Sequence, residues 1–200
     1  MARTGRPREF DRDHAVQTAL HLFWEHGYNA TSLAQLRTAM GISSASFYAA
    51  FGSKEALFEE TVQTYVARFG RVTDAVSQES LPPKAAVEHI LRASARMQTD
   101  HSHPSGCLIV LAAAVGADDQ SAVRALLTDY RAAVRRNVAT CIQRAVAAGE
   151  LSPATDPESM SIVFTGFLHG LSVESRDGTS LESLEAAITQ LMQVWDAARV

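Results

Sequence analysis

The stretch that decides the fold spans residues 31–58 and reads TSLAQLRTAMGISSASFYAAFGSKEALF. Its first part carries a capping box, in which Ser32 is followed three residues later by Gln35. Apolar side chains then recur at helical spacing, namely Leu33, Leu36 and Met40. This pattern predicts a short helix that ends at Gly41.

A second short helix is expected directly after Gly41. Ser43 or Ser44 can cap it, and it carries Phe47 and Tyr48. Two short helices joined by a tight glycine-containing turn form a helix-turn-helix, whose second helix is shaped to enter a major groove. Similar helix pairs also occur in protein cores that bind nothing, so the motif alone leaves both interpretations open.

The residue types in the second helix favour contact with DNA. Ser44, Ala45 and Ser46 are short, so they let the backbone approach base edges, and the serine hydroxyls can donate or accept. Tyr48 offers a phenol to a phosphate. A longer helix is expected to begin near Ser53, where free N–H groups and the Lys54 ammonium can face the DNA backbone.

Four spaced motifs occur in a familiar order. They are Gly-Tyr-x-x-Thr-Ser-Leu at 27–33, Met-Gly-Ile-Ser at 40–43, Ser-Phe-Tyr at 46–48 and Phe-Gly-Ser-Lys-Glu-x-Leu at 51–57. With these motifs the first third of the chain resembles the tetracycline-repressor family of bacterial transcription regulators.

The resemblance implies an all-α homodimer of about nine helices. An N-terminal three-helix domain would bind DNA, and a larger C-terminal domain would dimerise and hold an effector. The family also implies DNA contacts at Thr31, Ser32, Ser43, Ser44, Ala45, Ser46, Tyr48 and Lys54. The C-terminal part diverges within the family, so the effector is not carried over.

Composition sets the outer bounds. The chain has 200 residues, 46% of them hydrophobic, which is enough for a substantial core. No apolar run has the length of a membrane span, and no apolar segment follows the basic N-terminus, so we expect a cytoplasmic protein without a membrane partner. The net charge is −4, although residues 1–58 hold six basic against five acidic side chains.

Enzymatic signatures are missing from the sequence. No Gly-rich phosphate loop, His-Glu-x-x-His helix or nucleophile elbow organises the histidines and carboxylates. We therefore expect no enzyme and no cofactor. Two alternatives remain: an all-helical enzyme with a vestigial DNA-binding domain, and a DNA-binding activator or architectural protein that responds to no effector.

Four segments are expected along the chain. Residues 1–8 form a basic arm in which Arg3 and Arg6 either follow DNA or remain solvated. Residues 9–58 form the DNA-binding domain, which continues into a connecting helix over about 53–77. Residues 59–200 form the effector-binding and dimerisation domain.

The last two predicted helices, which begin near Asp156 and Thr179, carry broad apolar faces. Two such pairs from two chains can pack as a four-helix interface, the arrangement that the family uses. The alternative is an intramolecular core. The interface is predicted at Met160, Phe164, Phe167, Leu171, Leu184, Ile188, Leu191 and Trp195.

Three sensors fit the C-terminal sequence. Cys107 would be a reactive thiolate if Ser105 capped a helix there, but the apolar run that follows favours an inert core thiol. His101 and His103 with Cys107 could bind a metal, although no fourth ligand is evident and a polar surface loop is favoured. The third sensor is an apolar pocket, with candidate lining residues Phe69, Met97, Cys107, Leu111, Tyr130, Cys141 and Phe164.

Overall fold

The computed structural model describes residues 11–112 and 121–200. Their regular structure is helical apart from one isolated bridge between Leu151 and Arg199. The elements are α1 (Arg12–Ala30), α2 (Leu33–Met40), α3 (Ser44–Phe51), α4 (Lys54–Arg68), the 3-10 helix η1 (Gly70–Ser77), α5 (Pro83–Thr99), α6 (Leu108–Leu111), α7 (Ser121–Ala147), α8 (Pro157–Arg176) and α9 (Leu181–Ala197). The predicted all-α class is confirmed.

Local sequence signals set the N-terminal helices. The Asp11 side chain caps α1 by accepting from the His14 amide, and Ser32 and Gln35 form the predicted capping box of α2. Gly41 ends α2 with φ +67°, a left-handed conformation that glycine adopts without a Cβ penalty. Ser43 is the residue that caps α3. The helix-turn-helix therefore forms where the sequence predicts it.

The expected connecting helix over 53–77 is interrupted. The α-helix α4 ends at Arg68, and a 3-10 helix continues from Gly70 to Ser77. Glycine lowers helix stability because it loses more backbone entropy than other residues on ordering, so Gly70 is a natural break. The connection is thus two segments in series.

The buried side chains form two separate clusters. One combines α1–α4 with α6 and the beginning of α7, and the other combines η1, α5, α8 and α9 with the end of α7. The helix α7 contributes to both clusters, through Leu127 to the first and Ile142 to the second. The N-terminal core therefore includes residues far beyond the predicted domain limit at 58.

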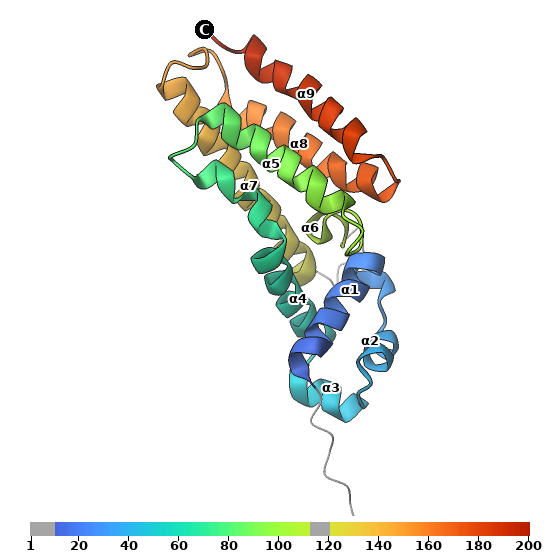
Figure 1. Cartoon of the computed structure of the whole chain (residues 1–200). Helices are drawn as coiled ribbons and strands as arrows, with labels where there is room; N and C mark the ends of the chain where they lie inside the picture. The colour runs from blue at the N-terminus through green and yellow to red at the C-terminus, as the bar shows by residue number, and fades with distance from the viewer. Residues whose placement is uncertain (1–10, 113–120) are drawn as a thin grey trace, which may run out of the picture.

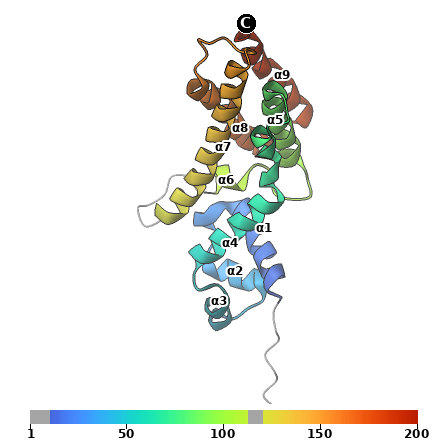
Figure 2. The ribbon, with the colours of Figure 1, turned by 90° about the vertical axis from the view of Figure 1, so that its left-hand side faces the viewer.

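The molecule is elongated, with α3 at one tip and α8 and α9 at the opposite end (Figures 1 and 2). The helix α4 rises from the α3 end toward α7, while α6 lies between the end of α1 and the helices above it. None of the helices in the described part of the chain is long and apolar enough to cross a membrane.

Candidate DNA-binding surface and effector cavity

The helix α3 buries one face and exposes the other. Phe47 and Phe51 are packed into the N-terminal core, whereas Ala45, Tyr48 and Ala49 face solvent. Tyr48 is 52% exposed although it is a large aromatic side chain. An exposed aromatic among small residues at the tip of the molecule is suited to lie against another macromolecule.

The serines at the start of α3 differ in how they are used. Ser43 accepts from the Ser46 amide at 3.1 Å, and the two hydroxyl oxygens lie 2.9 Å apart. Ser32 is likewise an N-cap, with its oxygen 3.1 Å from the Gln35 amide nitrogen. Ser32 and Ser43 are exposed, while Ser44 and Ser46 are half-buried. Ser44 and Ser46 belong to α3, Ser43 is its N-cap, and Ser32 is the N-cap of α2.

The Thr31 side chain is buried in this conformation. It is 0% exposed, and its hydroxyl donates to the Gly27 carbonyl at 2.7 Å. The DNA contact predicted at Thr31 stays a prediction, and it would require the buried side chain to become exposed. The residue instead ties the end of α1 to the start of α2.

Lys54 is held within the protein. Its ammonium donates to the Tyr28 carbonyl at 2.7 Å and lies 4.1 Å from the centroid of the Tyr28 ring. Burial lowers the pKa of this ammonium. The side chain thus braces α4 against α1, and the phosphate contact predicted for Lys54 stays a prediction.

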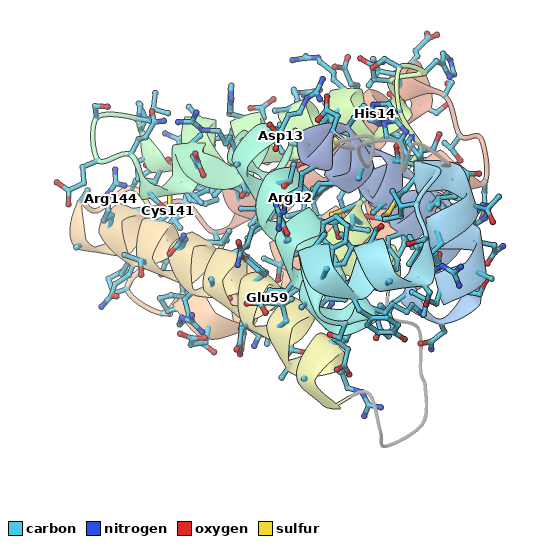
Figure 3. The ribbon with its side chains drawn as sticks, turned by 90° about the horizontal axis from the view of Figure 1, so that it is seen from below. Arg12, Asp13, His14, Glu59, Cys141 and Arg144 are labelled. Atoms are coloured by element: carbon cyan, nitrogen blue, oxygen red, sulfur yellow. The ribbon has the colours of Figure 1, made fainter. Side chains whose placement is uncertain are left out.

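A second brace joins the same two helices. Arg12 forms a two-pronged ion pair with Glu60, and Figure 3 shows Arg12 extending from α1 toward α4. No motif in the sequence identifies this pair, because the partners are far apart along the chain. Arg3 and Arg6 of the predicted basic arm lie outside the described residues.

An apolar cavity of about 100 Å³ lies where α4, η1, α5, α6, α7 and α8 meet. Three of the predicted lining residues, Met97, Cys107 and Tyr130, belong to it. The cavity also receives polar groups that sequence reasoning missed, namely Gln98, Arg131 and His169. Nothing in their spacing distinguishes them from surface positions of long helices.

Four other residues predicted for the pocket lie elsewhere. Phe69 packs on Trp24 with ring centroids 4.9 Å apart. Leu111 is the last residue of α6. Cys141 comes from α7 near Arg144 and is buried in the C-terminal core (Figure 3). Phe164 lies in that same core. Helical periodicity predicted that these residues point inward, but it could not predict which interior space each one reaches.

Cys107 lines the cavity as a protonated thiol. It is itself the N-cap residue of α6, in place of the predicted Ser105, and the Tyr65 hydroxyl donates to its sulfur at 3.3 Å. Burial raises the pKa of the Cys107 thiol, and the hydrogen bond from Tyr65 and nearby backbone N–H groups offset this only in part. The apolar interpretation of this cysteine is therefore supported over the thiolate.

His103 is used in packing. Its ring stacks on Trp24 at 4.5 Å between centroids and lies edge-on to Phe69 at 4.9 Å. Within the described residues, no group of three or more His, Cys, Asp or Glu side chains is arranged to hold a metal ion. His101, by contrast, is exposed.

The loop beside the cavity connects it to the DNA-binding domain. The Gly106 amide donates to the Gln98 carbonyl at 3.0 Å, and its carbonyl accepts from the Trp24 indole at 3.0 Å. Arg176, at the end of α8, donates to the carbonyls of Trp24 and Ser105. The loop thus bonds to α1 and α5, and Arg176 ties it to α8.

The residues predicted for the dimer interface are mostly buried in the chain's own core. Six of them are buried, with Met160 the most exposed at 7%, and Phe167 and Leu191 are half-buried. The face predicted for dimerisation is thus largely part of the chain's own core. The apolar side chains that do face solvent on α8 are Ile162, Val163 and Val173, which lie on one stripe with Gly166 and Gly170.

Comparison with known proteins identifies the family. Residues 15–61 match the bacterial regulatory proteins of the tetR family, and residues 83–191 match the tetracyclin repressor-like C-terminal domain. The chain belongs to the tetR family. The resemblance seen in the helix-turn-helix motifs therefore extends over both parts of the molecule.

Relatives within the tetR family match almost the whole chain. The HTH-type transcriptional repressor ComR of Escherichia coli is 31% identical over 192 residues, which cover 96% of this chain and 91% of ComR. The HTH-type transcriptional repressor BdcR of the same organism is 28% identical and covers 90% and 86%. These relatives are transcription regulators, not enzymes.

A solved structure of the tetR family superposes closely. The regulator CifR, a cysteine mutant in complex with 26-bp double-strand operator DNA, has a TM-score of 0.87 and 38% identity. The match covers 95% of this chain and 100% of the CifR chain. The fold described here is thus also that of a tetR-family protein determined on its operator.

Proposed function

We propose that this chain is a transcriptional repressor that binds a palindromic operator as a homodimer and leaves it when a small molecule occupies the C-terminal cavity. The repressor role rests on ComR and BdcR, and the operator on the CifR complex. A regulator of bacterial DNA works in the cytoplasm, which is where we place this protein.

The exposed face of α3 carries the proposal. A recognition helix must present short side chains to base edges and a few polar groups to phosphates. The α3 face offers Ala45 and Ala49 with Tyr48 among them, while Ser43 and Ser32 stand at the N-termini of the two short helices. Tyr48 is the residue whose hydroxyl we assign to a phosphate.

The homodimer is proposed on the exposed stripe of α8. An operator with two half-sites needs two recognition helices, so a single copy of α3 does not suffice. Ile162, Val163 and Val173 supply apolar area, and Gly166 and Gly170 have no neighbouring atoms within 4 Å of a built Cβ, so they permit close approach of a second helix. Val194 of α9 adds to the exposed apolar surface.

Release of the operator is a shift between two conformations. An effector shifts it only if it binds the DNA-incompetent conformation more tightly. The Gly106 loop, between Gln98 and Trp24, is the element through which we expect the cavity to act on α1. Arg176 adds a second tie between α8 and the same end of α1.

The test begins with selection of an operator from random duplex DNA and binding measurements at several salt concentrations. A palindromic site with strongly salt-dependent affinity is the expected result. Tyr48→Ala should weaken binding about tenfold, and Tyr48→Phe, the matched control that keeps the ring, should show how much of this belongs to the hydroxyl. If no site is selected and binding stays weak at any sequence, the regulator proposal is wrong.

Redox sensing at Cys107 is the second candidate. The thiol lines the cavity and so is reachable from it, but its raised pKa leaves little thiolate at neutral pH. We therefore expect hydrogen peroxide to leave operator affinity unchanged in wild type and in Cys107→Ser. Release by peroxide in wild type alone would make the thiol the sensor.

A further inference from the structure

The effector cavity carries a positive charge that no carboxylate among its described lining residues balances. Arg131 lines it, and none of the described residues that line it is Asp or Glu. The ion pairs formed within residues 11–112 and 121–200 do not include Arg131. Burial lowers the pKa of this guanidinium, and among the described groups only Cys107 opposes that change. The partly buried cation thus has no acidic partner within residues 11–112 and 121–200.

The Arg131 guanidinium is fixed in place. One terminal nitrogen donates to the Ile109 carbonyl at 2.7 Å, and the other donates to the Thr128 hydroxyl at 3.0 Å. Both acceptors are neutral, so they orient the group without cancelling its charge. A guanidinium has five N–H donors, and these two bonds leave donors for a ligand.

His169 does not supply a second charge. Burial has the largest effect and lowers the pKa of its imidazole, and repulsion from Arg131 and Arg135 lowers that pKa further. The neutral ring is therefore the dominant form at pH 7. Arg131 is thus the one cationic side chain among the described residues that line the cavity, and it favours a ligand with a single negative charge.

The rest of the wall decides the size and shape of the ligand. Met97 and Leu168 are apolar, and the volume is about 100 Å³. A dry protein cavity of roughly 150 Å³ accepts benzene, so this one suits roughly four to six non-hydrogen atoms. Gln98 is 3% exposed, and its side-chain oxygen has no hydrogen-bond partner among the described residues. The cavity wall therefore contains a buried polar group that is available to a ligand.

We propose that the effector is a short-chain monocarboxylate. Its carboxylate binds the Arg131 guanidinium and lies near the Gln98 amide, and its alkyl end packs against Met97 and Leu168. This inference rests on the proposed function, because it names the ligand class for the same cavity. The amide of Gln98 can present either its oxygen or its NH₂ group to the ligand, since the two are interchangeable by rotation.

The first measurement is the thermal stability of the full-length protein with sodium acetate, propionate, butyrate and hexanoate at matched ionic strength. Propionate and butyrate should raise the melting temperature by roughly 5–10 °C at about 100 times their Kd. Hexanoate should bind more weakly because its chain exceeds the cavity. Propionamide, butyramide and propylamine are the probes without the negative charge, and they should give no shift.

The second measurement repeats the series with Arg131→Gln. Its matched control is Arg135→Gln, which removes the same charge from an exposed position one turn along α7. Arg131→Gln should weaken carboxylate binding at least tenfold, while Arg135→Gln should keep it. Arg131→Lys, which retains the charge without the planar fork, should bind with intermediate affinity.

The outcomes separate this inference from the proposed function. If amides stabilise wild type as well as carboxylates do, or if Arg131→Gln binds them equally well, the ligand class is wrong. If the operator is bound but no carboxylate shifts the melting temperature, the ligand class is also wrong while the regulator proposal stands. If carboxylates stabilise the protein but no operator is found, the regulator proposal falls and the binding site remains.

Discussion

Single residues in the helix-turn-helix are used differently from what their sequence positions indicate. Thr31 and Lys54 are predicted DNA contacts, and both side chains bond to carbonyls at the end of α1. Ser32 and Tyr48 remain exposed. The contribution of each residue to DNA binding therefore has to be separated from its contribution to stability.

Thr31→Val tests this distinction. The change removes the hydroxyl that satisfies the Gly27 carbonyl and keeps the branched shape, so the free energy of unfolding should fall by about 1–2 kcal/mol. Urea unfolding measures it, with the exposed Thr38→Val as the control. Unchanged stability combined with weaker operator binding would instead make Thr31 a direct DNA contact.

At the scale of elements, the short helix α6 and the loop before it join the two cores. Gly106 has φ +80°, and a Cβ built there would lie 2.6 Å from the Leu111 side chain and 2.8 Å from the Ser172 carbonyl oxygen. The Tyr28 amide also donates to the Ala112 carbonyl at 2.9 Å. The loop thus packs tightly against α8 on one side and α1 on the other.

Gly106→Ala should therefore destabilise the protein by about 2 kcal/mol or more, since strain at positive φ adds to the collision with Ser172. Gly149→Ala is the matched control, because Gly149 has φ +71° with no atom within 4 Å of its built Cβ. Gly149→Ala should lower the free energy of unfolding only by the cost of placing alanine at positive φ, about 1 kcal/mol. If denaturant unfolding gives equal losses of unfolding free energy for the two variants, the close contacts at Gly106 relax without cost.

At the scale of the whole molecule, the exposed stripe of α8 is the surface that we propose for dimerisation. Ile162 is 58% exposed and lies one helical turn from Gly166 on that stripe. A charge buried there between two chains would be unpaired and costly. The state of assembly and the affinity for a two-half-site operator should therefore change together.

Ile162→Glu is expected to convert the proposed dimer to monomers in sedimentation velocity at micromolar concentration, and to weaken operator binding at least tenfold. Val200→Glu is the control, because Val200 is 88% exposed at the end of the chain. A dimer that persists in Ile162→Glu would place the interface on another surface. A wild-type monomer at all concentrations would contradict the homodimer itself.

The sequence by itself determined the helix-turn-helix, the all-α class and the family. The caps at Ser32 and Ser43 and the turn at Gly41 act over three or four residues, so local chemistry is enough to fix them. The same signals could not determine what each inward-facing residue reaches. Periodicity gives the apolar face of a helix but not the element that covers it.

Only the tertiary structure decided the remaining points. In the structure Phe164 and Trp195 are buried in the chain's own core, whereas Ile162 is exposed. Arg131 and Cys107 both line the cavity. These placements depend on how α5, α7, α8 and α9 cross one another, which is set by contacts between residues far apart in the chain. The physical reason is that burial and charge pairing are properties of packed neighbours, and packing is long-range.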